Sequence, residues 1–266
     1  YLIADSAEKC AASLVVEGFT SEKEHERAAQ VYLDGRGILR PATPWLSPEF
    51  TNPLFLRTTA NALQQMGASE YPAGLHGTKQ VLRFYLDAAG RHLGTDRDGS
   101  DDLIAPTLRA VRSIARAMAE ERSDHLPLAT ARTLTANAFS DYVPSTGVSW
   151  LDVLHRRGIL RYDPPISDEN SDPLEMPEDV VRFGFQRFQD HLVAEALLDE
   201  VVPSTSAFAE GGALSFMIER HHGRAWLSYE WRTVFQALWI AHAERSGAEI
   251  IDVLPEDVEG QLADDF

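Results

Sequence analysis

Residues that could bind phosphate or metal, or act as nucleophiles, are few in this chain. The segment Gly74–Lys79 (GLHGTK) has glycines and a lysine, but its spacing is not G-x-x-x-x-G-K-[ST] and no strand pattern precedes it. It therefore indicates a helix entry. His221 and His222 follow Glu219, yet adjacent histidines on one element point in different directions, which favours solvated polar residues over a metal site. G-x-S-x-G is absent. The sequence predicts no catalytic or metal-binding residue and leaves enzymatic activity open.

The composition describes an acidic globular chain. Its 266 residues are 44% apolar, enough for the core of one large domain or two small ones. The 41 acidic residues outnumber the 24 basic ones and give a formal net charge of −17, so the surface repels phosphate and disfavours a nucleic-acid partner. A single cysteine, Cys10, excludes an internal disulfide framework and fits a reducing, cytoplasmic location.

Membrane and secretion signals are not evident. No apolar run reaches the roughly 20 residues that a membrane-spanning helix needs, and no signal-peptide pattern opens the chain. We therefore expect no membrane partner. Because the chain begins at Tyr1 and its structural patterns start almost at once, we expect it to be a fragment of a longer protein.

The stretch around which the other elements are organised is Val180–Leu198. Val181, Phe183 and Phe185 alternate with less apolar residues, which is the period of a strand. From Phe185 onward the apolar spacing changes to three or four residues, which is the period of a helix. This change predicts a strand that runs directly into an amphipathic helix.

The segments before this stretch complete a compact pattern. Residues 102–121, 129–139 and 150–157 have helical spacing, and residues 159–162 have the pattern of a short strand. Ser149 can cap the third helix, and Gly158 can end it. Three helices followed by a two-stranded hairpin predict a winged-helix domain, with the acidic residues 163–179 as its wing.

The rest of the chain is mostly helical in pattern. Residues 14–16 suit a short strand, and Ser21 with Glu24 predicts a capping box for a helix over 22–33. Asn52 can cap the next helix, with Pro53 at its first position. A further helix covers 79–93, and residues 201–212 have the composition of a linker. Apolar residues from Trp231 to Trp239 predict another amphipathic helix.

Three stretches resemble motifs of the NACHT-type STAND NTPases. Residues 182–194 (RFGFQRFQDHLVA) resemble the signature F-x-H-x-x-F-Q-E-[FY]-L-A-A that ends the family's winged-helix domain. Residues 49–56 (EFTNPLFL) resemble the proline motif of its small helical domain, and residues 14–22 (LVVEGFTSE) resemble the strand and helix that leave its nucleotide-binding core. The stretches follow the family's order and jointly span about two thirds of the chain. The first is most similar to bacterial antiphage AVAST ATPases.

The resemblance implies a nucleotide-dependent switch that uses ATP or ADP with Mg. In the family a proline packs against the adenine, and Pro53, preceded by Asn52, matches its position. A histidine of the signature contacts the β-phosphate in the closed ADP state; Phe185 takes its place here, and Gln186 is the candidate substitute. ATP would open the winged-helix lid and allow homo-oligomerisation, triggered by a protein ligand, such as a phage protein, on the C-terminal region.

The resulting interpretation is a mostly α chain with four parts. Residues 1–40 would end an α/β P-loop NTPase core, 41–99 form the small helical domain, 100–200 the winged-helix domain, and 201–266 the start of a C-terminal helical sensor region. The Walker motifs are expected before Tyr1, and the function would be signal transduction in antiphage defence. Taken one at a time, the motifs favour ordinary core packing; their joint order reverses this and favours the switch.

Two other classes stay open. The first is a winged-helix DNA-binding transcription regulator that uses His155, Arg156 and Arg157 of the third helix, although the acidic residues 163–179 beside that helix oppose phosphate approach. The second is a noncatalytic helical scaffold.

Overall fold

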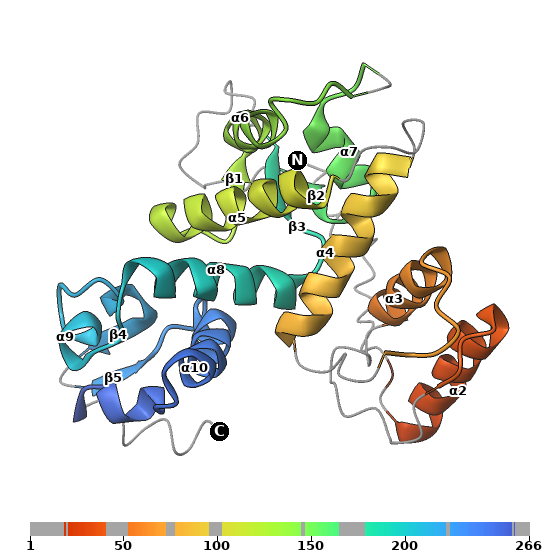
Figure 1. The fold of residues 1–266 in the computed structure, drawn as a ribbon. Helices are drawn as coiled ribbons and strands as arrows, with labels where there is room; N and C mark the ends of the chain where they lie inside the picture. Colours follow the sequence, from red (N-terminus) through yellow and green to blue (C-terminus); the bar gives the residue numbers. More distant parts are fainter. Residues whose placement is uncertain are drawn as a thin grey trace, which may run out of the picture. The chain divides into compact units, whose positions relative to one another are not determined.

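The computed structural model describes residues 19, 21–40, 53–72, 78–95, 103–144, 147–164, 179–221, 224–256 and 258, and over these ranges the protein is mostly helical (Figure 1). The mainly α fold expected from the sequence is confirmed. The chain divides into two compact units, Tyr1–Val81 and Leu82–Phe266. None of the helices in the described ranges combines the length and the apolar composition needed to cross a membrane. The strand predicted at 14–16 lies outside these ranges.

The first unit begins its described part with α2 (Glu22–Leu33). The hydroxyl of Ser21 accepts the N–H of Glu24 at 3.3 Å, and the Glu24 carboxylate accepts the N–H of Ser21 at 3.2 Å. The predicted capping box and helix bounds are confirmed. The buried face carries Ala29 and Leu33, whereas Val31, which has an apolar side chain, is 61% exposed.

The second helix of this unit is α3 (Pro53–Gln65), which starts at the predicted proline. Gly67 follows it with φ +68°, a left-handed conformation that favours glycine after a helix. Arg36, in the short 3₁₀ helix η1 (Asp34–Arg36), donates two hydrogen bonds to the Asn61 amide oxygen of α3, at 3.0 and 2.6 Å. These bonds join α3 to the end of α2. The next helix, α4 (Thr78–Thr95), continues into the second unit.

The second unit contains a small antiparallel sheet among helices. In chain order its first elements are α5 (Ile104–Glu121), β1 (Leu126–Pro127), α6 (Leu128–Ala138), α7 (Trp150–Arg156), β2 (Leu160–Asp163), β3 (Val180–Phe183) and α8 (Gln186–Glu200). The strand order is β1-β3-β2, with Val181 opposite Leu126 and Phe183 opposite Leu160. The three predicted helices and two predicted strands are confirmed, while β1 was not predicted. Residues 165–178, most of the predicted wing, lie outside the described ranges.

Helix α8 is buried on more than one face, because α5 packs against one side and α10 (Arg232–Ser246) against another (Figure 1). The predicted apolar stripe, including Phe188 and Leu192, is buried. Three polar residues are buried as well: Gln189, Asp190 and His191. Buried polar side chains need hydrogen-bond partners, and three consecutive helix residues point in different directions, so α8 makes polar contacts on more than one side.

The C-terminal part of the unit packs around α10. It comprises α9 (Thr205–Phe208), the 3₁₀ helices η3 (Ser215–Met217) and η4 (Ile250–Val253), and a hairpin of β4 (Ile218–His221) and β5 (Arg224–Leu227). The interpretation of residues 201–212 as a linker was wrong, because Ser204 caps α9 and Phe208 is fully buried against Phe235. The predicted helix from Trp231 to Trp239 is confirmed as α10.

Candidate functional site

Phe185 and Gln186, the two candidate site residues of the second unit, lie at the turn between β3 and α8. A Cβ atom on Gly184 would lie 2.1 Å from the carbonyl oxygen of Gly158, so only glycine allows this approach. The Gly184 N–H donates to the Ile159 carbonyl at 2.8 Å. Phe185 follows with an extended backbone (φ −125°, ψ 118°), and α8 begins at Gln186. The predicted change from strand to helix is confirmed.

Phe185 is held in an aromatic cluster. Its ring meets Tyr85 of α4 edge-on at a centroid distance of 5.6 Å and Phe188 at 5.2 Å. The hydroxyl of Tyr85 donates to the carbonyl of Arg157 at 3.4 Å, and burial raises the pKa of Tyr85. Phe185 therefore stabilises the packing of α4 against the start of α8, and its ring has no polar group to offer a phosphate.

Gln186, the proposed substitute for the family's histidine, is exposed and already has a protein partner. Its side-chain amide donates to Oδ1 of Asp190, one turn further along α8, at 2.8 Å. Gln186 also lines a cavity, described below, on the side of α8 that faces α10. Gln186 can therefore reach a ligand in this cavity through the free face of its amide.

Gln189 joins three segments from a buried position that is 1% exposed. Its side-chain oxygen accepts the backbone N–H of Phe183 in β3 at 3.1 Å. Its side-chain N–H donates to the carbonyl of Asp124, in the loop between α5 and β1, at 2.8 Å. Both hydrogen-bonding groups of the amide are thus satisfied, and Gln189 fixes α8 to the sheet and to that loop.

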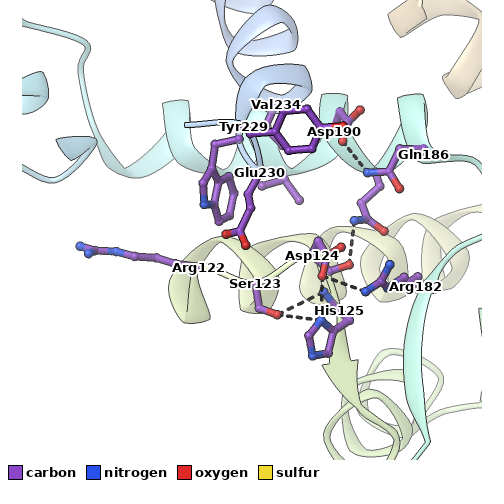
Figure 2. Close-up of a pocket in the computed structure, with 13 residues that line it drawn as sticks. Arg122, Ser123, Asp124, His125, Arg182, Gln186, Asp190, Tyr229, Glu230 and Val234 are labelled. Atoms are coloured by element: carbon purple, nitrogen blue, oxygen red, sulfur yellow. Dashed lines mark hydrogen bonds and ion pairs between the residues drawn. The ribbon is translucent and has the colours of Figure 1, made fainter. Parts of the chain in front are cut away.

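A cavity of about 450 Å³ opens where the α5–β1 loop, β3, α8 and the turn before α10 meet (Figure 2). We call it the junction cavity. Its lining combines charged, amide, aromatic and aliphatic side chains: Arg122, Ser123, Asp124, His125, Arg182, Gln186, Gln189, Asp190, Val193, Tyr229, Glu230, Trp231 and Val234. Its volume falls within the range of about 300–1,000 Å³ that is typical of small-ligand pockets.

The positive groups around the junction cavity are engaged by the protein. Arg182 lies 3.2 Å from a carboxylate oxygen of Asp124 and 3.4 Å from one of Asp163. Nδ1 of His125 lies 2.7 Å from the same Asp124 oxygen. Arg122 extends away from the other lining side chains (Figure 2), with its guanidinium carbon 4.9 Å from the ring centre of Phe216.

Asp190 is the most buried carboxyl in the lining, at 4% exposure. Burial raises its pKa, while hydrogen bonds from Gln186 and Thr233 and the charge of Arg187 act in the opposite direction. The nearby charge of Asp124 raises the pKa further. The pKa of Asp190 is raised overall, so burial outweighs the groups that favour its carboxylate form.

The remaining predicted site residues belong to the first unit. Pro53 is the first residue of α3 and is half-buried, and its missing N–H costs nothing at that position. Asn52 lies outside the described residues. Because Pro53 lies in one unit and Phe185 with Gln186 in the other, their assignment to one nucleotide site stays a prediction.

Several residues of the junction cavity were missed by sequence reasoning. Asp190 was noted only as part of a motif, and Asp124 and Glu230 lie in a loop and a turn without periodic pattern. An available signal was the run Gln189-Asp190-His191 inside a helix whose flanking residues are apolar. Such a run suggests that packing partners cover more than one side of the helix.

Comparison with known proteins assigns no family to the chain. No protein-family model matches the chain, and no curated protein is significantly similar to it in sequence. Within the ranges that the structure describes, no group of three or more His, Cys, Asp or Glu residues is arranged to hold a metal ion. His221 is exposed at the end of β4.

Proposed function

We propose that this chain is the regulatory part of a NACHT-type STAND ATPase, in which a winged-helix lid controls oligomerisation in antiphage defence. The observation that carries the proposal is the arrangement around the β3–α8 turn. From α5 to β3 the elements run helix, strand, helix, helix, strand, strand, and β3 pairs with both β1 and β2. This order and pairing are expected of a winged helix, and the residues that resemble the family signature follow at the expected place.

The signature residues also have physical roles that suit a lid. Phe183 and Phe188 are buried, and Gln189 ties β3, α8 and the α5–β1 loop together. A module that moves as one body between closed and open states needs such internal connections, because a loosely packed turn would deform instead of transmitting motion. These contacts support a rigid lid.

The fit of the residues to ADP or ATP differs between the two predicted contacts. Pro53 suits an adenine contact, since it presents a rigid half-buried ring at a helix start. Phe185 does not suit a phosphate contact, because its ring packs against Tyr85 and Phe188. We therefore assign no phosphate role to Phe185. In the proposal, Mg and most nucleotide contacts come from other parts of the ATPase, and a bound nucleotide supplies the free-energy difference between the closed and open states.

Titration calorimetry of ADP with the full-length protein tests the adenine assignment. Pro53→Glu should weaken ADP binding by about tenfold or more, because it replaces an apolar stacking surface with a negative charge that repels the phosphates of ADP. Gln64→Glu is the matched control: it adds the same charge to an exposed position of α3 and should leave the affinity unchanged. Equal ADP affinity of Pro53→Glu and wild type would remove the assignment. A coding sequence without G-x-x-x-x-G-K-[ST] upstream of Tyr1 would remove the ATPase proposal itself.

The alternative, a DNA-binding regulator, has less support. The helix that would read DNA, α7, has only seven residues, and its His155 stacks on Tyr162 at a centroid distance of 4.2 Å. Asp152 on the same helix adds negative charge where phosphate would approach. We expect no duplex binding in a low-salt gel-shift assay. Binding that is lost on Arg156→Glu/Arg157→Glu would favour the regulator instead.

A further inference from the structure

The junction cavity lies beside α8, where α8 is covered by both α5 and α10. A ligand there would touch the loop after α5, the polar face of α8 and the turn before α10 at once. The nature of that ligand can be derived from the charges in the lining, because some are already compensated by the protein and others are not. A ligand in this cavity would be separate from the nucleotide of the proposed switch.

Most of the positive groups in the lining are paired with carboxylates of the protein. Asp124 interacts with both Arg182 and His125, and Arg182 interacts also with Asp163. Arg122, also in the lining, lies over the ring of Phe216. An anionic ligand at Arg182 would therefore have to displace an existing ion pair.

The other two carboxylates in the lining are Asp190 and Glu230. Among the described residues, no lysine or arginine forms an ion pair with either of them. Asp190 accepts hydrogen bonds from two neutral groups, the Gln186 amide and the Thr233 hydroxyl, and Arg187 acts on it through its charge. Figure 2 shows Glu230 extending toward Ser123 and Asp124 from the opposite side of the cavity. A cation beside Asp190 would offset the cost of burying its carboxylate and the repulsion from Asp124.

The rest of the lining indicates the shape of the cation. Trp231 and Tyr229 contribute aromatic surface, with Tyr229 88% exposed at the rim. Guanidinium groups stack on aromatic faces and donate several hydrogen bonds in one plane, which suits two separated carboxylates better than a compact ammonium does. Val193 and Val234 can pack against an aliphatic chain. We propose that the junction cavity is a binding site for a guanidinium-bearing ligand, either a small guanidine or an arginine side chain of a partner protein.

Binding of N-acetyl-L-arginine amide to the 266-residue chain, followed by NMR shifts of the Gln186 and Gln189 side-chain amides, tests this site. N-acetyl-L-citrulline amide is the matched probe, because it has nearly the same shape without the charge. We expect the arginine probe to bind about tenfold or more tightly than the citrulline probe, since charge-assisted hydrogen bonds are the stronger ones. Equal binding of the two probes, or shifts confined to residues outside the cavity, would overturn the proposal.

A pair of variants assigns the effect to the cavity. Glu230→Gln keeps the shape of an exposed side chain and should weaken binding of the arginine probe about fivefold or more. Glu244→Gln makes the same charge change on the exposed face of α10 and should have no effect. Equal affinities of Glu230→Gln and wild type would contradict the site. Agmatine compared with the arginine probe distinguishes the source: tighter binding of agmatine supports a small guanidine, and tighter binding of the capped arginine supports a protein partner.

Discussion

Replacing Gln189 with leucine should destabilise the second unit, because it removes both hydrogen bonds by which α8 is fixed to β3 and to the α5–β1 loop. The buried Phe183 N–H would lose the Gln189 oxygen that accepts its hydrogen bond, which costs about 1–3 kcal/mol. The Asp124 carbonyl belongs to an exposed residue that water can reach, so its loss costs less, about 0.5–1.5 kcal/mol. We expect the free energy of unfolding to fall by about 2–4 kcal/mol.

Urea unfolding followed by tryptophan fluorescence measures this loss. Four of the five tryptophans lie in the second unit: Trp150, Trp226, Trp231 and Trp239. Gln236→Leu is the matched control, since Gln236 is exposed on α10, and it should change the stability by no more than about 0.5 kcal/mol. If Gln189→Leu unfolds at the same urea concentration as Gln236→Leu with an unchanged slope, the bridging role of Gln189 is refuted.

Three further predictions concern the turn and the two perturbed carboxyl groups. Gly184→Ala should cost about 1–3 kcal/mol, because its Cβ would lie 2.1 Å from the Gly158 carbonyl oxygen, whereas Gly35→Ala, with nothing within 4 Å, should cost little. Hydrogen bonds from Ser149 and Tyr162 lower the pKa of Asp152 below the usual 3.8. Asp152→Asn should therefore destabilise at pH 7, and its difference from wild type should shrink as the pH falls through the lowered value. Burial raises the pKa of Asp190, so the stability of Asp190→Asn relative to wild type should increase as the pH rises above 3.8.

Urea unfolding at several pH values between 3 and 7 checks the two carboxyl predictions together. The stability differences of Asp152→Asn and Asp190→Asn from wild type should change in opposite directions with pH. If both stability differences changed in the same direction with pH, the physical cause given for one of the two pKa shifts would be wrong. For the turn, equal stability of Gly184→Ala and Gly35→Ala would contradict the close backbone approach.

The elements that sequence reasoning found are those whose signals are local. Ser21 and Glu24 are three residues apart, and Ser149 and Asp152 are too, so each helix start is encoded in a few neighbouring residues. The change of period at Phe185 is local as well, and it predicted the junction of β3 and α8.

The missed elements depend on distant partners. Strand β1 has two residues and exists because Leu126 pairs with Val181, 55 positions later in the chain by their numbers. No pattern within two residues can indicate such a pairing. Strand β5 did carry a local signal, because Ala225 and Leu227, which are buried, alternate with the exposed Arg224 and Trp226.

The candidate site was predictable only in part for the same reason. Gln186 was singled out from its place in a motif, and it does line the junction cavity. Asp190 and Glu230 could not be combined from sequence, since 40 positions separate them and only the packing of α10 on α8 brings their elements together. Pro53 was correctly predicted at the start of α3. Its place in one nucleotide site with Gln186 stays a prediction.

The central claim, a lid governed by nucleotide, is tested most directly by hydrogen exchange in the full-length protein. The measured segment is the β3–α8 turn, residues 180–193, compared between ADP and a nonhydrolysable ATP analogue. A closed lid in the ADP state should slow exchange of these amides about fivefold or more relative to the ATP analogue, in line with typical coupling between sites. Identical exchange with both nucleotides, each bound at saturation, would contradict the switch.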